Sequence, residues 1–278
     1  MADIGLYAPA YDGSMVGGKG AALLVLKRAG LPVLDGIIIP TQFFQYFITD
    51  RLGGQTISET NADMIKDEVY GIDFTEEFRE NVLSALEKIG TDNSTFIVRS
   101  SANIEDGLRY SFAGSFSSIL NVKKSEIFDS IKRVYASVFD RRVLGYIKQL
   151  RIPILGIKMA VIIQEFINTD YAGVAFTADP VLNDDNKMRI EMVKGLGEGL
   201  VSGKKTPYSA IIDRGNRSIT VSRKSEGIDE FKANEIINQL IPIALKIEDI
   251  YKAPVDIEFG IKNSELIIFQ ARAITTIK

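Results

Sequence analysis

Residues 255–259 read Val-Asp-Ile-Glu-Phe, and residues 267–272 read Ile-Ile-Phe-Gln-Ala-Arg. Apolar and polar side chains alternate in both segments, and a polar stretch at residues 262–265 separates them. This pattern predicts an antiparallel hairpin. A turn centred on Ser264 puts the following side chains on the apolar face of that hairpin: Val255, Ile257, Phe259, Ile267, Phe269 and Ala271.

The opposite face of the predicted hairpin is polar. The same register pairs Glu258 with Gln270 and Asp256 with Arg272. A carboxylate, an amide oxygen and a guanidinium on one face suit a Mg²⁺ ion together with a phosphate group. The alternative is a sheet with one solvated face that carries an Asp–Arg pair.

A cluster of glycines surrounds Lys19 in the stretch Gly17-Gly18-Lys19-Gly20. The stretch nearly matches a P-loop, but Gly20 lacks the hydroxyl that would bind Mg²⁺, and no convincing buried strand precedes it. Clustered glycines let backbone N–H groups approach an anion, and the helix predicted over residues 18–29 adds a favourable dipole. Lys19 adds a full positive charge. The alternative is a glycine-rich turn followed by a solvated lysine.

Arg99 ends an apolar strand predicted over residues 95–99, and a loop of small residues at 111–118 follows it. An arginine at the end of a strand can hold phosphate with its planar fork, and such a loop can fold over polyphosphate. The alternative is an ordinary strand end, in which Arg99 pairs with Glu105 or Asp106.

The order of the predicted elements indicates the fold class. Helices predominate in the first half, whereas short strands predominate in the second half and a helix at residues 233–251 precedes the hairpin. We therefore expect an α+β protein that forms a single domain over residues 1–278. Its two lobes would be a helix-rich one over about residues 1–120 and a sheet-rich one over about residues 121–278, with the ligand in the cleft between them.

Composition excludes several classes of site. The 278 residues include no histidine and no cysteine, so thiolate nucleophiles, disulfides and imidazole-ligated or thiolate-ligated metals are excluded, which leaves hard ions such as Mg²⁺. The net charge of −3 argues against a nucleic-acid partner. The apolar runs are too short to cross a membrane, and the N-terminus lacks a signal-peptide pattern, so we expect a cytoplasmic protein with no membrane partner.

Taken in order, these segments resemble the ATP-binding domain of the phosphoenolpyruvate synthase and pyruvate phosphate dikinase family, which has an ATP-grasp fold. The resemblance covers nearly the whole chain. The matching segments are Gly17-Gly18-Lys19-Gly20-Ala21, Val98-Arg99-Ser100-Ser101-Ala102, Ser111-Phe112-Ala113-Gly114 with Leu120-Asn121-Val122, Gln164, Gly173-Val174-Ala175-Phe176-Thr177-Ala178-Asp179-Pro180, Gly195-Leu196-Gly197-Glu198, Asp256-Ile257-Glu258 and Gln270-Ala271-Arg272.

The resemblance implies a fold, an activity and site residues. In that family this domain binds MgATP and transfers the β-phosphate, through a pyrophosphoryl step, to a histidine on a mobile domain, and AMP and phosphate are released. The implied catalytic residues are Arg272, Arg99 and Lys19. Those that bind the nucleotide are Lys19, Arg99, Gly114, Ser118, Gln164, Glu165 and Ile167, of which Glu165 and Ile167 would offer backbone contacts to adenine. Those that hold Mg²⁺ are Glu258 and Gln270.

Because the chain contains no histidine, we expect a histidine-containing phosphocarrier domain or subunit to act as its partner in trans. The leading hypothesis is an ATP-dependent phosphotransferase that is incomplete without this partner. One alternative is an ATP-grasp carboxylate ligase that forms an acyl phosphate and yields ADP. Another is a non-catalytic ATP-binding scaffold.

Overall fold

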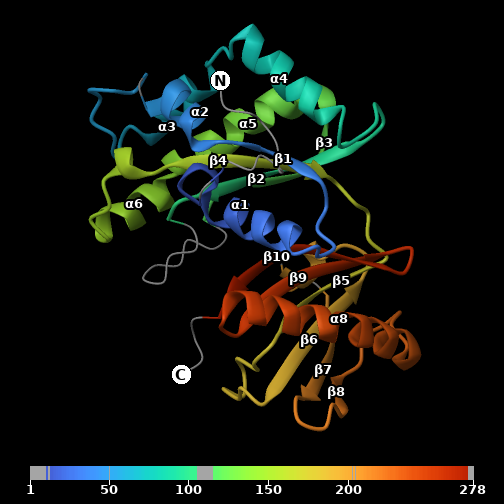
Figure 1. Cartoon of the computed structure of the whole chain (residues 1–278). Helices are drawn as coiled ribbons and strands as arrows, with labels where there is room; N and C mark the ends of the chain where they lie inside the picture. Colours follow the sequence, from blue (N-terminus) through green and yellow to red (C-terminus); the bar gives the residue numbers. More distant parts are fainter. Residues whose placement is uncertain are drawn as a thin grey trace. The chain divides into compact units, whose positions relative to one another are not determined.

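The chain folds into two compact units, and the elements of both are drawn in Figure 1. The computed structural model describes residues 11, 13–49, 51–104, 115–201, 203 and 205–274, apart from the side chains of residues 155, 198 and 201. Unit 1 contains the chain up to Leu24 and Asp35–Phe166. Unit 2 contains Val25–Leu34 and the chain from Ile167 onward. Both units combine helices with antiparallel sheets, so the predicted α+β class is confirmed.

Unit 1 is built on a four-stranded antiparallel sheet in the order β1-β4-β2-β3. The strands are β1 (Gly36–Ile39), β2 (Thr95–Ala102), β3 (Ser118–Lys123) and β4 (Met159–Glu165). They are rich in Ile, Val and Phe, which favour extended backbone. The strand predicted at residues 95–99 is confirmed and continues to Ala102.

The helices of this unit come before and between its strands in the sequence. They are α1 (Gly13–Arg28), α2 (Thr41–Phe44), α3 (Ala62–Tyr70), α4 (Glu76–Leu86), α5 (Ile127–Ala136) and α6 (Arg141–Gln149), with short helical turns at Gln45–Thr49, Lys124–Glu126, Ser137–Phe139 and Ile154–Gly156. The last residues of α1, from Val25 onward, belong to unit 2. Thr75 caps α4, because its hydroxyl accepts a hydrogen bond from the backbone N–H of Phe78 at 3.3 Å.

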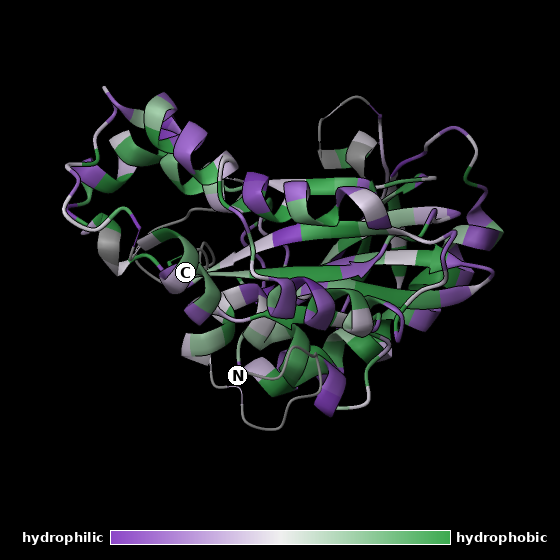
Figure 2. Ribbon diagram, turned by 90° about the horizontal axis from the view of Figure 1, so that it is seen from above, coloured by the Kyte–Doolittle hydropathy of each residue, from purple (hydrophilic) through white to green (hydrophobic). Residues whose placement is uncertain are grey.

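One face of the sheet of unit 1 packs against α2 to α5 and forms the main core. Phe96 and Val98 of β2 are buried in this core, so the alternating side chains of Ile97 and Arg99 lie on the other face. Figure 2 shows the strands mostly in hydrophobic colours and the helices with hydrophilic residues along part of their surface. Because β3, α5, α6 and β4 all belong to this unit, it continues past the expected lobe boundary near residue 120 to Phe166.

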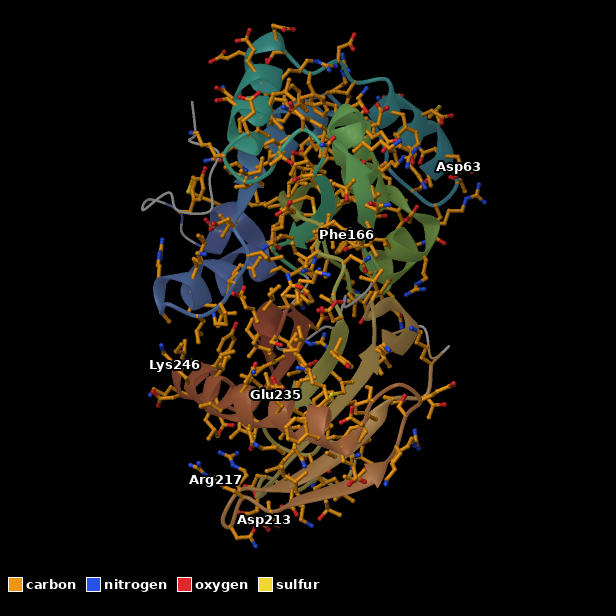
Figure 3. The ribbon with its side chains drawn as sticks, turned by 90° about the vertical axis from the view of Figure 1, so that its right-hand side faces the viewer. Asp63, Phe166, Asp213, Arg217, Glu235 and Lys246 are labelled. Atoms are coloured by element: carbon orange, nitrogen blue, oxygen red, sulfur yellow. The ribbon has the colours of Figure 1, made fainter. Side chains whose placement is uncertain are left out.

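Unit 2 contains a six-stranded antiparallel sheet in the order β10-β9-β5-β6-β7-β8. The strands are β5 (Tyr171–Phe176), β6 (Lys187–Lys194), β7 (Tyr208–Asp213), β8 (Ile219–Arg223), β9 (Val255–Lys262) and β10 (Glu265–Ala273), and the helices are α7 (Glu198–Val201) and α8 (Glu230–Tyr251). Asp213 and Arg217 mark the turn between β7 and β8 (Figure 3).

The long helix α8 covers one face of the sheet of unit 2. The helix predicted at residues 233–251 is confirmed and begins at Glu230, after Asp229 accepts the backbone N–H of Lys232 as a cap. Its apolar side is buried through Ala233, Ile236, Ile237, Leu240, Ile241, Ala244 and Ile247. The sheet presents Val255, Ile257, Phe259 and Ala271 among its own buried residues. The side chains that alternate with these lie on the opposite face.

The β9–β10 hairpin confirms the predicted register. Glu258 is opposite Gln270, and Asp256 is opposite Arg272. The two turn residues have positive φ, at 51° for Asn263 and 66° for Ser264, as the tight two-residue turns of hairpins require.

The predicted apolar face of this hairpin is wrong at two positions, Ile267 and Phe269. Between the turn and Ile268, the observed pairing is shifted by one residue from the predicted pairing. An irregularity between Ile268 and Gln270 brings the two strands back to the predicted pairing. Ile268 is therefore opposite Phe259 and is fully buried, whereas Ile267 falls on the polar face. The cause is a β-bulge, which inserts one extra residue and exchanges the two faces on the turn side of the bulge.

Candidate functional site

The glycine-rich segment forms a break within α1 rather than a loop before it. Gly17 has φ 68° and ψ 177°, which interrupts the helix between its first turn and the segment from Gly18 to Arg28. A Cβ atom at Gly17 would lie 2.0 Å from the backbone oxygen of Ser101. This position therefore requires glycine both for its backbone conformation and for its contact with β2.

Lys19 follows this break and points to the end of β2. Its Nζ atom donates a hydrogen bond to the backbone oxygen of Ser100 at 3.4 Å. Ser100 is the residue after Arg99, so the structure brings the predicted lysine and arginine to neighbouring positions. The first-turn N–H groups of the helix segment that begins at Gly18 point out of its N-terminal end, which favours an anion there.

Three other predicted residues share one face of the sheet of unit 1. Arg99 on β2 is directly opposite Ser118 on β3. Gln164 on β4 is opposite Ile97, two residues before Arg99 on the same strand, so it lies on the same face. Gln164 is only 3% exposed. This face is the one turned away from the helical core, and it gathers a guanidinium, a hydroxyl and an amide.

The remaining predicted residues of this part of the sequence are Glu165, Ile167 and Gly114. Glu165 ends β4, and its carboxylate accepts a hydrogen bond from the hydroxyl of Ser94 at 2.7 Å. This bond fixes the end of β4 just before Phe166. Ile167 is the first residue of unit 2 after that strand. The prediction for Gly114 lies outside the described residues, as do Glu105 and Asp106.

The three predicted residues of unit 2 lie together on the polar face of the hairpin. Glu258 and Gln270 are directly opposite each other. Arg272 donates two hydrogen bonds to one carboxylate oxygen of Asp256, from Nε at 2.9 Å and from Nη2 at 2.7 Å. The Asp–Arg pair that the sequence left as an alternative is therefore present, on the same face of the hairpin as Glu258 and Gln270 and two residues along each strand from them.

On the same face of the sheet of unit 2, a second carboxylate, that of Glu191, lies in line with Glu258 and Gln270. Val174 on β5 is opposite both Glu191 on β6 and Glu258 on β9, and Gln270 continues the row on β10. In the described part of the chain, no group of three or more acidic side chains is placed to hold a metal ion. One carboxylate and one amide oxygen side by side fit Mg²⁺, which takes its other ligands from phosphate oxygens and water.

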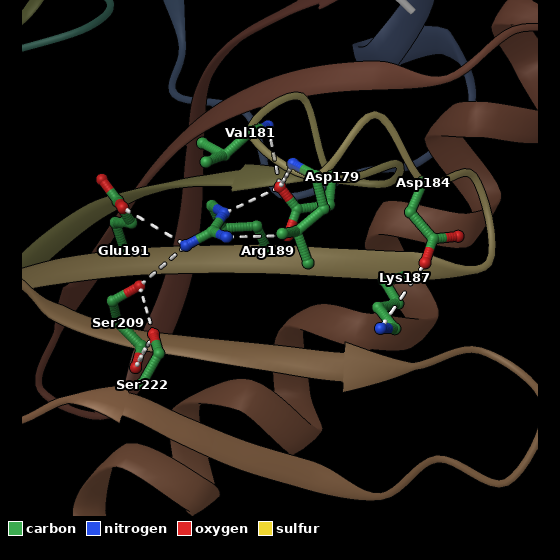
Figure 4. Close-up of polar contacts among 9 residues, drawn as sticks. Asp179, Val181, Asp184, Lys187, Arg189, Glu191, Ser209 and Ser222 are labelled. Atoms are coloured by element: carbon green, nitrogen blue, oxygen red, sulfur yellow. Dashed lines mark hydrogen bonds and ion pairs between the residues drawn. The ribbon is translucent and has the colours of Figure 1, made fainter.

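A buried ion pair lies on the same face, between the loop after β5 and strand β6 (Figure 4). Arg189 donates to both carboxylate oxygens of Asp179, from Nε at 2.9 Å and from Nη2 at 2.8 Å. Its third nitrogen lies 3.3 Å from the hydroxyl of Ser209 and 4.0 Å from the carboxylate of Glu191. Asp179 is 0% exposed and Arg189 is 8% exposed. This pair was not predicted, because alternation in residues 187–192 places Arg189 on the polar face with Lys187 and Glu191, and nothing in the sequence pattern marks it as buried.

The carboxylate of Asp179 makes stability depend on pH. Burial raises its pKa, but hydrogen bonds from Arg189 and from the N–H groups of Leu182 and Val181 outweigh burial and hold the pKa below the ordinary value of 3.8. Because the folded-state pKa is the lower one, the stability that Asp179 contributes is present above about pH 4 and is lost as the pH falls through the folded-state pKa. Urea unfolding across this range should show a larger loss in the wild type than in Asp179→Asn, and equal losses would contradict this expectation.

The sequence matches the family described as "Pyruvate phosphate dikinase, AMP/ATP-binding domain" over residues 13–278. The chain belongs to this family. The family resemblance inferred from the motifs is thereby confirmed, and the matched range contains every predicted site residue. A member of the pyruvate phosphate dikinase AMP/ATP-binding family binds nucleotide through this domain, so the polar residues described above in each unit are its candidate nucleotide-binding residues.

The proteins similar to this chain include two relatives by sequence and one solved structure. An uncharacterized phosphotransferase, YvkC, from Bacillus subtilis is 34% identical over 95% of this chain and 34% of the relative. A probable phosphoenolpyruvate synthase from Methanocaldococcus jannaschii is 29% identical over 96% of this chain and 26% of the relative. The chain thus spans about a third or less of the length of these relatives. Among solved structures, D-alanine–D-alanine ligase from Bacillus anthracis has a TM-score of 0.43 at 11% identity, covering 94% of this chain and 57% of the ligase.

Among the described residues, the helices are too short or too polar to cross a membrane.

Proposed function

We propose that this chain binds MgATP and transfers the β-phosphate, through a pyrophosphoryl step, to a histidine on a separate domain or subunit. The bond between the α- and β-phosphates breaks first, which releases AMP and leaves a pyrophosphoryl group on the histidine nitrogen. The bond between the β- and γ-phosphates then breaks as the γ-phosphoryl group passes to water, so phosphate is released and the β-phosphate stays on the histidine. The observation that supports this proposal most is the shared face of unit 1, where Arg99, Ser118 and Gln164 lie together and Lys19 reaches the same strand end.

Each of the predicted groups of unit 1 has a role that its chemistry suits. Lys19 and Arg99 neutralise charge on the polyphosphate, and the guanidinium of Arg99 can bind two oxygens at once. The hydroxyl of Ser118 donates to a phosphate oxygen. The end of β4, fixed through Glu165, offers backbone groups to the adenine edge, with Gln164 beside it. Positioning and charge neutralisation supply most of the catalysis in phosphoryl transfer.

Unit 2 supplies the metal ligands in this proposal. Glu258 and Gln270 would hold Mg²⁺, which neutralises phosphate charge when it is bound. Arg272, oriented by Asp256, would contact the transferring phosphoryl group. The acceptor comes from a partner because the sequence contains no histidine. A histidine-bearing domain incubated with the chain and ATP labelled at the β-phosphate should acquire the label, and a histidine-free variant of that domain should not.

The carboxylate ligase remains the second candidate function, and its nucleotide product distinguishes it. An enzyme that forms an acyl phosphate releases ADP, whereas the proposed transfer releases AMP. Chromatography of the nucleotides therefore separates the two reactions. Tight ATP binding without either product in the presence of the partner would favour the scaffold.

Removing the charge of Lys19 should weaken ATP binding. Lys19→Ala deletes a charge-assisted hydrogen bond to phosphate, so we expect the Kd for ATP in calorimetry to rise by about 10- to 100-fold. Lys148→Ala is the matched control, because Lys148 is an exposed lysine of the same unit at the end of α6. Equal ATP affinity in Lys19→Ala and the wild type would refute the assignment of this site.

A further inference from the structure

The hydroxyl of Ser101 occupies the break in α1. Ser101 is fully buried. Its Oγ atom donates a hydrogen bond to the backbone oxygen of Val16 at 2.6 Å and accepts one from the backbone N–H of Gly20 at 3.0 Å. In a continuous helix, the N–H of residue 20 bonds the carbonyl of residue 16. A side chain from β2 therefore bridges the two groups that one turn of α1 would otherwise join directly.

The hydroxyl of Ser101 holds the chain on both sides of Lys19. The two bonded backbone groups lie on either side of it in sequence, and the Nζ atom of Lys19 reaches the backbone oxygen of Ser100. Ser101 is also two residues after Arg99, so both side chains lie on the same face of β2. One buried hydroxyl thus connects the segment that carries the lysine to the strand that carries the arginine.

We propose that Ser101 is a positioning residue for ATP binding, which holds Lys19 of α1 in place next to the strand that carries Arg99. The inference rests on the function proposed above. It assigns Ser101 no contact with the nucleotide, because its hydroxyl is engaged by α1 on both its donor and its acceptor side. Gly17 completes the arrangement, since a Cβ atom there would lie 2.6 Å from the Ser101 hydroxyl.

Loss of this hydroxyl should act through Lys19. Ser101→Ala leaves the carbonyl of Val16 and the N–H of Gly20 without this bridge, so the break can rearrange. We expect calorimetry to show a Kd for ATP that is about 10-fold higher in Ser101→Ala than in the wild type, which corresponds to about 1.4 kcal/mol of binding free energy. In a Lys19→Ala background, the same serine substitution should change the Kd by less than about 3-fold, because residues that act as a unit are not additive.

A purely structural role for Ser101 predicts a different result. In that case Ser101→Ala lowers affinity by the same factor with and without Lys19, and this additivity would overturn the inference. Thr75→Ala serves as the matched control, since it removes a hydroxyl that caps α4 in the same unit and should leave the Kd for ATP unchanged. Should Ser101→Ala fail to fold, Ser101→Cys tests the same coupling with a weak donor in place of the hydroxyl.

The two proposals fail in distinguishable ways. If Lys19→Ala leaves the Kd unchanged, the ATP site itself is wrong and the role of Ser101 falls with it. If Lys19→Ala weakens binding while Ser101→Ala does not, the proposed function stands and only the positioning role is overturned.

Discussion

Replacing Arg189 with methionine should lower the free energy of unfolding by about 3–5 kcal/mol. The guanidinium contacts both carboxylate oxygens of Asp179, which is fully buried. Removal of Arg189 leaves that carboxylate as an uncompensated charge inside unit 2, and this is more costly than the loss of an exposed ion pair. Urea unfolding followed by far-ultraviolet circular dichroism measures the change.

The matched control for this substitution is Arg217→Met. Arg217 is exposed at the β7–β8 turn (Figure 3), so its replacement should change the unfolding free energy by less than about 0.5 kcal/mol. Adding Asp179→Asn to Arg189→Met should recover part of the lost stability, because it removes the uncompensated charge and keeps an oxygen for Val181 and Leu182. Similar small effects in Arg189→Met and Arg217→Met would contradict the buried-pair account.

The hairpin shows what local pattern can predict. Alternation in residues 255–259 and around Gln270 was sufficient to pair Glu258 with Gln270, and the structure has this pair. The bulge was not predictable from the sequence. Residues 266–269 are all apolar, so the alternation of polar and apolar residues does not indicate which of them is the additional residue of the bulge. Ile268 is buried because of tertiary packing, through its bridge to Val33 and the N–H bond that it donates to Pro32.

The glycine-rich segment shows a different limit. Its glycines predicted close backbone approach, and Gly17 does lie against β2. The identity of the partner, Ser101, is set by a strand more than 80 positions away, with sequence separations of 85 from Val16 and 81 from Gly20. The same holds for Asp179 and Arg189, which face each other only after β5 and β6 pair. Motif chemistry therefore predicts candidate groups for the site, and the fold determines which side chains hold those groups in place.

Replacing Glu258 with glutamine should remove the Mg²⁺ dependence of ATP binding and nearly abolish phosphoryl transfer. The substitution keeps the size of the side chain and its position opposite Gln270, but it removes the only charge of the proposed ligand pair. A neutral amide pair attracts Mg²⁺ far less than a carboxylate does, and the phosphate charge then stays unneutralised in the transition state. AMP formation with a histidine-bearing partner should fall by about 100- to 1,000-fold, the scale found when one electrostatic stabiliser is removed.

Two measurements separate this expectation from a general loss of folding. Calorimetric titration with ATP, with and without Mg²⁺, needs no partner, and the affinity gained from Mg²⁺ in the wild type should be absent in Glu258→Gln. Glu265→Gln is the matched control, because it makes the same charge change on the same hairpin at an exposed position beside the turn. It should retain the Mg²⁺ effect and the rate of AMP formation. If Glu258→Gln and Glu265→Gln show the same Mg²⁺ effect and the same rate of AMP formation, the metal is held elsewhere. Arg272, and not Glu258, then becomes the group of the hairpin that acts on phosphate.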